Sequence, residues 1–187
     1  MMRDISLHIM DIMQNSIDAG ASEIGLILET KTDEDLLYVT IIDNGCGMDE
    51  EFLKRVTDPF TTSRTTRQVG LGISMFRLSG EICGGSFELW SEKGKGTSIT
   101  VSYGISHIDR IPLGEIGNAV SSTILSYPLV KYTMMTKGGN MEISFDTDEV
   151  KKRIAGVSVS EYNVIKWVRE YINEGIVNSF RGILKEL

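Results

Sequence analysis

The chain has 187 residues, of which 41% are hydrophobic and 24% charged, and its formal net charge is −7. This length and composition are typical of one globular domain, or of one small domain with an appendage. The negative charge, without a run of Lys or Arg, argues against nucleic acid or an anionic membrane as a main partner.

The cysteines and the N-terminus point to a reducing, internal compartment. Cys46 and Cys83 are too few for a disulfide framework and form no CxxC pair, so any metal is expected to be bound by oxygen. No apolar run is long enough to cross a bilayer, and the first residues lack the pattern of a signal peptide. We therefore expect a cytoplasmic protein.

The first predicted element is a helix within LHIMDIMQNSIDAGA, residues 7–21, which ends at the glycine Gly20. Polar side chains recur along it at steps of three, four and three residues: His8, Asp11, Asn15 and Asp18. At 3.6 residues per turn they form one stripe along an otherwise apolar helix. Such a stripe either faces a cleft or forms a solvated edge of the helix.

Two strands, residues 23–30 and 36–43, follow around the polar turn KTDED, and a glycine turn, DNGCGM, comes directly after them. The stretch VTDPFTTSRTTRQVGLG carries no period and predicts a loop. A helix is expected over residues 73–83, and two more strands, SFELWS and TSITVSYG, complete the first 104 residues. This order predicts an α+β fold: a mixed sheet with helices on one face, forming a two-layer sandwich.

Beyond residue 104 the texture of the sequence changes, so we expect a boundary between residues 1–104 and 105–187. The first part, SHIDRIPLGEIGNAVSS at residues 106–122, has scattered Gly and Pro and suggests a linker. LVKYTMM and MEISFDT predict a hairpin around KGGN, and Asp146 or Thr147 can cap a short helix. A last helix is expected to start near Ser160, with one apolar face: Val164, Trp167, Val168, Tyr171 and Ile172. This part is expected to be a small α/β domain for interaction or regulation.

The glycine turn DNGCGM can be a simple turn or part of a ligand site. Asn-Gly after a strand is a common turn signal. However, Gly45 and Gly47 also permit close approach of a ligand to the backbone, and Asp43 at the strand end can accept hydrogen bonds from an exocyclic amine.

The segment TTSRTTRQVGLGIS suggests an anion site. Gly70 and Gly72 precede a helix, whose free N–H groups and positive dipole end favour phosphate. Hydroxyls and two guanidinium groups stand just upstream: Thr61, Thr62, Ser63, Arg64 and Arg67. In an acidic protein these groups are suited to bind phosphates, although a solvated loop before a capped helix explains the same pattern.

Taken together, NSIDAGA, DNGCGM, PFTTSR with VGLGIS, and SEKGKGTSITV resemble the four boxes of the GHKL ATPases, in order and spacing. This superfamily joins gyrase-type topoisomerases, Hsp-type chaperones, histidine kinases and mismatch-repair ATPases. The resemblance covers residues 5 to about 104. The last two boxes look most like the histidine-kinase domain, whereas NSIDA looks more like the gyrase and mismatch-repair version.

The resemblance implies a Bergerat-type fold that binds ATP with Mg²⁺ beneath a flexible lid. Asn15 would hold the Mg²⁺ ion, Asp43 would accept from the adenine amine, and Thr97 would support the adenine. The N–H groups of Gly70, Leu71 and Gly72 would face the phosphates. The other implied ATP-binding positions are Asp18 and Ala19 on the helix, Gly45, Gly47 and Met48 around the base, and Phe60, Thr61, Thr62, Ser63, Arg64 and Arg67 in the lid.

One position departs from the family pattern and concerns catalysis. Hydrolytic members have a glutamate four residues before the asparagine, where this chain has Asp11. A carboxylate one methylene shorter lies about 1.5 Å further back, and such a displacement of a base can cost about a hundredfold. Asp11 is the candidate base, and His8, one turn away, could assist it or serve only in packing.

A phosphoacceptor candidate occurs in HIDRIPL, residues 107–113, which has the spacing of the histidine-kinase acceptor box. Ile108 stands where an acidic residue is expected, and Gly114 and Gly117 weaken any long helix, by about 1 kcal/mol each in a helix interior. His107 is therefore a candidate acceptor, and a plain linker explains the same segment.

The favoured function is a Mg-ATP-binding signalling protein, either a protein kinase or a slow ATPase. A stand-alone domain of this type also resembles the anti-sigma serine kinases. The alternative is a non-catalytic switch, in which ATP changes the conformation and residues 105–187 dock onto a protein partner. A third possibility is a homodimeric clamp like that of the mismatch-repair ATPases, with Lys131 or Lys137 reaching the γ-phosphate.

Overall fold

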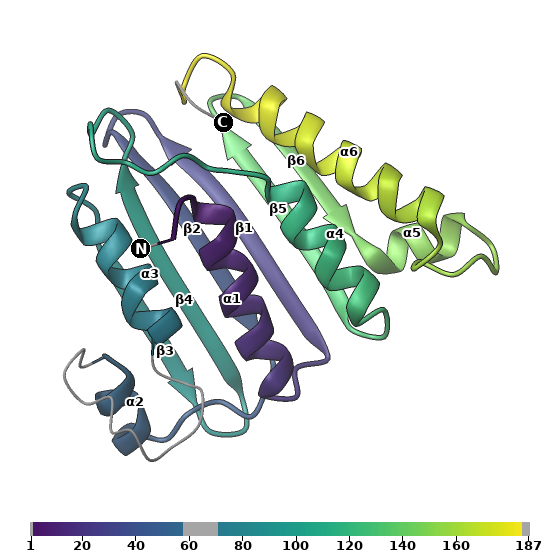
Figure 1. Cartoon of the computed structure of the whole chain (residues 1–187), viewed down its shortest axis with the longest axis horizontal. Helices are drawn as coiled ribbons and strands as arrows, with labels where there is room; N and C mark the ends of the chain where they lie inside the picture. The colour runs from purple at the N-terminus through teal and green to yellow at the C-terminus, as the bar shows by residue number, and fades with distance from the viewer. Residues whose placement is uncertain (1, 58–70, 185–187) are drawn as a thin grey trace.

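The computed structural model describes residues 2–57 and 71–184, which form two layers, a six-stranded sheet and a layer of helices on one face of it (Figure 1). The strands are β1 Glu23–Lys31, β2 Leu36–Asp43, β3 Phe87–Glu92, β4 Gly96–Gly104, β5 Lys131–Gly138 and β6 Met141–Asp146. The helices are α1 Ile5–Asp18, α2 Glu50–Thr57, α3 Leu71–Glu81, α4 Ile116–Ser126, α5 Thr147–Arg153 and α6 Tyr162–Phe180. Among the described helices, none is long and apolar enough to cross a membrane.

The sheet is mixed, with the strand order β3-β4-β2-β1-β5-β6. All neighbouring pairs are antiparallel except β1 and β5, which are parallel. Every second residue of the central strands is buried beneath the helices, including Leu37, Val39 and Ile41 of β2. The α+β fold with a mixed sheet, predicted from the order of the elements, is confirmed.

Helix α1 lies over the middle of the sheet and has well-defined ends. Asp4 caps its start by accepting from the Leu7 N–H at 3.1 Å. At its end, Gly20 has φ 75° and donates to the Ile17 carbonyl, while Ala21 donates to the Ser16 carbonyl. These bonds form a Schellman motif, so the helix end predicted at Gly20 is confirmed.

The sheet continues across the boundary that the sequence suggests at residue 105. β5 pairs with β1 over eight residues, from Glu23↔Lys131 to Thr30↔Gly138. Helix α4 packs against α1, and the connector before α4 bonds to the start of α1, where Ile5 N–H donates to Pro112 and Ser6 N–H to Leu113. That residues 105–187 act as an independent interaction or regulatory domain stays a prediction.

Helices α2 and α4 are not predicted from the sequence. In α4, Gly117 allows close contact with α6, because a Cβ there would overlap the Asn173 side chain. The Asn173 side chain also accepts from the Gly117 N–H at 3.1 Å, which caps α4 from a neighbouring helix. On the expected apolar face of α6, Trp167 is not buried: it is 45% exposed and stacks on Tyr171, with 5.2 Å between ring centroids. The helix continues to Phe180.

Candidate functional site

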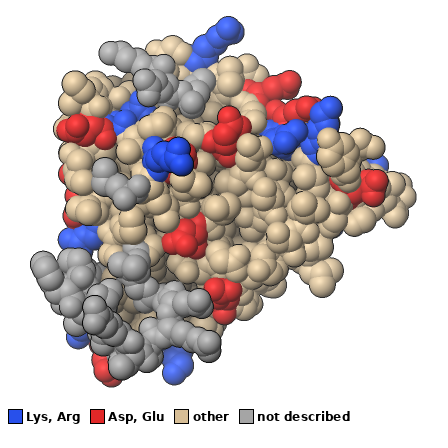
Figure 2. Space-filling view, viewed as in Figure 1, with Lys and Arg blue, Asp and Glu red and all other residues tan. Residues whose placement is uncertain are grey.

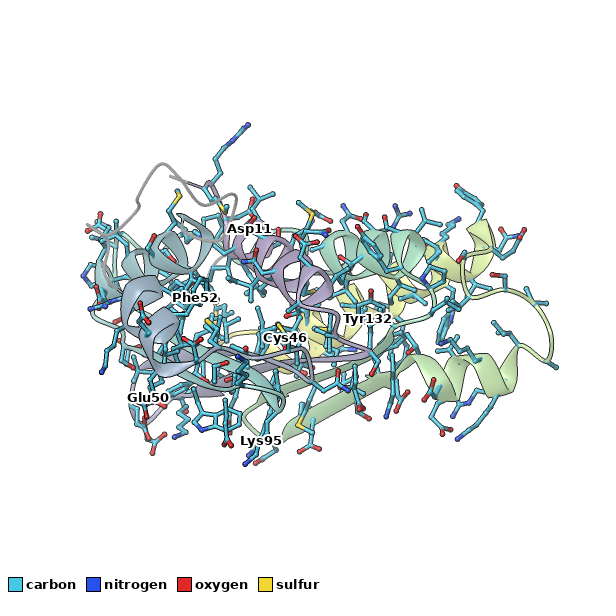
Figure 3. The ribbon with its side chains drawn as sticks, turned by 90° about the horizontal axis from the view of Figure 1, so that it is seen from below. Asp11, Cys46, Glu50, Phe52, Lys95 and Tyr132 are labelled. Atoms are coloured by element: carbon cyan, nitrogen blue, oxygen red, sulfur yellow. The ribbon has the colours of Figure 1, made fainter. Side chains whose placement is uncertain are left out.

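A cavity of about 430 Å³ lies beneath α1, between the ends of β2 and β4 and helix α2. In Figure 3, Phe52 of α2 and Cys46 of the glycine turn lie below α1 in this region. The lining residues are Ile12, Asn15, Ser16, Asp18, Ala19, Asp43, Cys46, Gly47, Met48, Asp49, Phe52, Ile73, Lys93, Thr97 and Ile99. Apolar walls with a few fixed polar groups are typical of a small-molecule site.

Asp43 ends β2 on the face that α1 covers, in line with Val39 and Ile41. Its carboxylate is held at both oxygens, because Ser16 Oγ of α1 donates to Oδ2 at 2.7 Å and the Gly45 N–H donates to Oδ1 at 2.9 Å. Each carboxylate oxygen has further lone pairs. Asp43 can therefore still accept hydrogen bonds from a ligand in the cavity.

Thr97 lies directly opposite Asp43 across the β2–β4 pair, on the same face of the sheet. It is only 9% exposed and lines the cavity. Gly47 and Met48 follow from the glycine turn, and the Met48 N–H donates to Ser91 Oγ at 2.8 Å. Asp43, Gly47 and Met48 therefore meet Thr97, which is far from them along the chain, at one end of the cavity.

Asp11 and Asn15 of α1 face the first turn of α3. A Cβ on Gly72 would overlap Asp11 Oδ2 and would lie 3.6 Å from Asn15 Nδ2. A glycine at this position therefore lets the two side chains approach the N-terminus of α3. Burial raises the pKa of the Asp11 carboxyl above its usual range.

Some of the remaining expected ATP-binding residues lie at the cavity, and others lie outside the described residues. Asp18 and Ala19 line the cavity near the end of α1, and Gly45 packs against Ala19. The lid residues Phe60, Thr61, Thr62, Ser63, Arg64 and Arg67, and also Gly70, lie outside the described residues. Leu71 begins α3.

The residues present fit a magnesium ion that is held mainly by a bound phosphate. Within residues 2–57 and 71–184, no group of three or more His, Cys, Asp or Glu side chains could hold a metal by itself. Mg²⁺ commonly takes one or two protein oxygens and completes its shell with phosphates and water. Asn15, a cavity-lining amide close to the start of α3, can supply such an oxygen.

His8 is not among the residues that line the cavity. It is 1% exposed and stacks on Phe76 of α3, with 5.4 Å between ring centroids, and neither of its ring nitrogens has a hydrogen-bond partner. Burial lowers its pKa from 6.5 to about 4. These contacts support a packing role between α1 and α3 more than assistance to Asp11.

We expect His8 to make the protein sensitive to acid. Above pH 6.5 the imidazole is neutral in both states, but between pH 6.5 and 4 only the unfolded chain binds the proton. The free energy of unfolding should therefore fall by about 2–3 kcal/mol between pH 7 and 4.5. Urea unfolding of wild type and His8→Leu at both pH values measures this. An equal loss in both proteins would contradict the assignment.

The structure does not bring His107 or the two lysines to the cavity. His107 follows the far end of β4, and the run from Thr97 to Gly104 spans about 23 Å at about 3.3 Å per residue. The segment around it forms turns rather than a helix, so His107 stays a prediction only as an acceptor for another molecule. Lys131 and Lys137 lie on the sheet face away from the helices, paired with Glu23 and Glu29.

Several lining residues were missed by sequence reasoning. Ser16 is buried next to the predicted Asn15. Its place inside the motif NSIDA is a signal that could have identified it. Phe52 belongs to α2, and Asp49, the residue before that helix, accepts from the Phe52 N–H at 2.8 Å. Lys93 comes from the β3–β4 turn, where nothing in the sequence separates it from an ordinary solvated lysine.

Comparison with known proteins identifies relatives of this chain. The sequence profile of the histidine kinase-, DNA gyrase B-, and HSP90-like ATPase family matches residues 3–106. A putative sensor protein of Shewanella frigidimarina is 34% identical over 103 residues, which cover 54% of this chain and 16% of that protein. The DNA mismatch repair protein MutL of Chlorobaculum tepidum is 27% identical over 184 residues, covering 78% of this chain and 29% of MutL.

The fold also has a solved counterpart. The N-terminal domain of a DNA repair protein superposes with a TM-score of 0.53 at 14% sequence identity, over 76% of this chain and 52% of that one. The chain spans less than a third of the length of the two curated relatives. The similarity therefore concerns an ATPase-type domain and not the whole of those proteins.

Proposed function

This chain belongs to the histidine kinase-, DNA gyrase B- and HSP90-like ATPase family, and from that membership we propose that it binds Mg-ATP in the cavity beneath α1. The observation that carries the proposal is the convergence of Asp43, Thr97 and Asn15 on one cavity. Titration with ATP and Mg²⁺ by calorimetry tests it. Absence of saturable binding would contradict it.

The polarity of the cavity supports one orientation of the nucleotide. Asp43 and Thr97 lie at the strand ends and suit the adenine amine. Asn15 lies near Gly72 at the N-terminus of α3, where the helix dipole and free N–H groups favour phosphate. The adenine then enters between the strand ends and α2, and the phosphates extend along α1 toward α3.

The proposed activity is that of a signalling enzyme, a protein kinase or a slow ATPase. Phosphoryl transfer depends mainly on positioning and charge neutralisation, and Mg²⁺, when bound, would supply part of the latter. Asp11 is not among the residues that line the cavity, but it lies close to Gly72, next to the lining residues Asn15 and Ile73, and its raised pKa favours proton uptake. These features support Asp11 as the base that accepts a proton from water or from a protein hydroxyl.

Replacement of Asp11 by Asn tests this role. ATP affinity should stay within about threefold of wild type, while turnover falls at least about a hundredfold. Because the carboxylate must be ionised, the wild-type rate should also decrease as the pH falls through a pKa above the usual 3.8. Phosphate release and transfer to added protein, measured from pH 4.5 to 8, check both expectations. Unchanged turnover in Asp11→Asn would contradict the role.

The second candidate function is a switch that binds ATP without turnover and docks a protein partner. It is favoured by the hydrogen bonds of Ile5 and Ser6 to the connector, which join α1 to the C-terminal part. Helix α4 has no charged side chain, and Figure 2 shows an uncharged surface over it. Leu125 of α4 is exposed, and Leu129, which follows this helix, is 94% exposed. Such apolar exposure supports a protein partner or a second copy.

Turnover separates the two candidates. Tight ATP binding with neither phosphate release nor transfer supports the switch, because a population shift requires only that ATP favours one conformation. Turnover that depends on Asp11 supports the enzyme.

A further inference from the structure

Three side chains form a row across the sheet at the end of the cavity assigned to adenine. Ser91 of β3 lies opposite Thr97 of β4, which in turn lies opposite Asp43 of β2. All three are on the face that the helices cover. Thr97 and Asp43 line the cavity, whereas Ser91 stands behind Thr97 and is not among the lining residues.

The Ser91 hydroxyl joins three segments of the site. It accepts from the Met48 N–H at 2.8 Å, and it lies 3.0 Å from the Gly96 carbonyl oxygen and 3.0 Å from Thr97 Oγ1. The glycine turn, β3 and the start of β4 therefore meet at one oxygen atom.

The number of protons in this cluster decides how Thr97 is oriented. A serine hydroxyl has one proton and two lone pairs. If Ser91 donates to the Gly96 carbonyl, its second lone pair can accept the Thr97 proton, and all three bonds form. If Ser91 donates to Thr97 instead, its bond to Gly96 is lost. Since hydrogen-bond networks settle in the most completely bonded arrangement, the first is favoured.

In this arrangement Thr97 offers only lone pairs to the cavity. Asp43, already held by Ser16 and Gly45, also offers only lone pairs while ionised. The end of the cavity therefore accepts hydrogen bonds and donates none from these two side chains. At position 6 of the purine, an amine can donate to both side chains, whereas the carbonyl oxygen of a 6-oxo purine is opposed by acceptors; Thr97 and Asp43 are therefore assigned to position 6 rather than to N1.

We propose that Ser91 is a positioning residue that fixes the Thr97 hydroxyl as a hydrogen-bond acceptor and so contributes to the selection of 6-amino over 6-oxo purine nucleotides. The proposal rests on the nucleotide-binding function proposed above. It adds a residue that does not touch the ligand and assigns it an effect on base selectivity rather than on overall affinity.

The test compares ATP with inosine triphosphate, which carries an oxo group in place of the amine. In Ser91→Ala the Thr97 hydroxyl is free to turn and donate to the oxo group. We expect the ratio of the two dissociation constants to fall about tenfold, mainly through tighter binding of inosine triphosphate. Calorimetric titration of both nucleotides with wild type and variant gives this ratio, and circular dichroism confirms that the variant folds.

Two further variants show that the effect passes through Thr97. In a Thr97→Val background, Ser91→Ala should no longer change the ratio. Ser98→Ala is the matched control, since Ser98 is the next residue on β4 and lies on the opposite face of the sheet, so the ratio should stay at the wild-type value.

Equal weakening of both nucleotides in Ser91→Ala would overturn the proposal, because a purely structural role predicts that result. So would a change of the ratio that persists in the Thr97→Val background. Failure of the wild-type protein to bind either nucleotide would instead contradict the proposed function, which keeps the two failures distinguishable.

Discussion

Replacement of Asp43 by Asn should weaken ATP binding at least about a hundredfold. The carboxylate accepts from Ser16 Oγ and from the Gly45 N–H through separate oxygens. An amide has one oxygen, so its NH₂ group must face one of these donors or the adenine amine. Ser16 Oγ can turn to the Ile12 carbonyl oxygen, 3.2 Å away, so the main loss is the acceptor oxygen that the carboxylate offers to the adenine amine. Calorimetric titration with ATP measures the change.

Asp146→Asn is the matched control for this experiment. Asp146 also ends a strand, β6, and also accepts from the N–H two residues further on, that of Asp148, at 2.7 Å. It caps α5, a role that Asn performs equally well. ATP affinity should therefore stay within about twofold of wild type. A comparable loss in both variants would show that Asp43 acts on the fold rather than on the ligand.

Replacement of Gly47 by Ala should lower the free energy of unfolding by about 3–5 kcal/mol. Gly47 has φ 63°, and an added Cβ would overlap the carbonyl oxygen of Glu92. The position of the Cβ is fixed by the backbone of residue 47, and the Glu92 oxygen is a backbone atom, so neither can move without distorting the β3–β4 turn beside the cavity. Guanidinium unfolding of wild type and variant measures the effect, and ATP binding should weaken in parallel.

Gly94→Ala separates steric overlap from backbone strain. Gly94 also has a positive φ, 80°, but nothing lies within 4 Å of an added Cβ. Its replacement should cost about 1–2 kcal/mol, the strain of a left-handed residue alone. If both variants lose the same free energy, the contact with Glu92 is not the cause of the larger loss expected at Gly47.

The parts of the fold that depend on local sequence were predictable. Alternating apolar residues gave β1 to β4 within one or two residues, and Gly20 gave the end of α1. The cap of α5 was expected at Asp146 or Thr147, and the structure has it at Asp146. The convergence of Asp43, Asn15 and Thr97 followed from the order of four motifs, since no periodicity reports which strands are neighbours.

The parts that depend on contacts between distant segments were not predictable. Helix α4 contains Gly117 and lacks a capping side chain of its own, so its sequence reads as a linker. It forms because Gly117 fits against α6 and Asn173 caps it. The parallel pairing of β1 with β5 was not predictable either, because the apolar pattern of a strand does not indicate which strand lies beside it. Ser91 was missed since its role lies in hydrogen bonds across the sheet.

The parallel pairing of β1 with β5 has a thermodynamic consequence for the C-terminal half. A ligand that binds only the native state raises the free energy of every opening that destroys its site. β1 lies between β2, which ends at Asp43 in the cavity, and β5, so separating β5 from the sheet uncovers the strand next to the site. Nucleotide bound beneath α1 would thus raise the free energy of any opening of β5 and β6 that also disrupts β1 and β2, although it touches neither β5 nor β6. The stability of the C-terminal half would then depend on the nucleotide concentration.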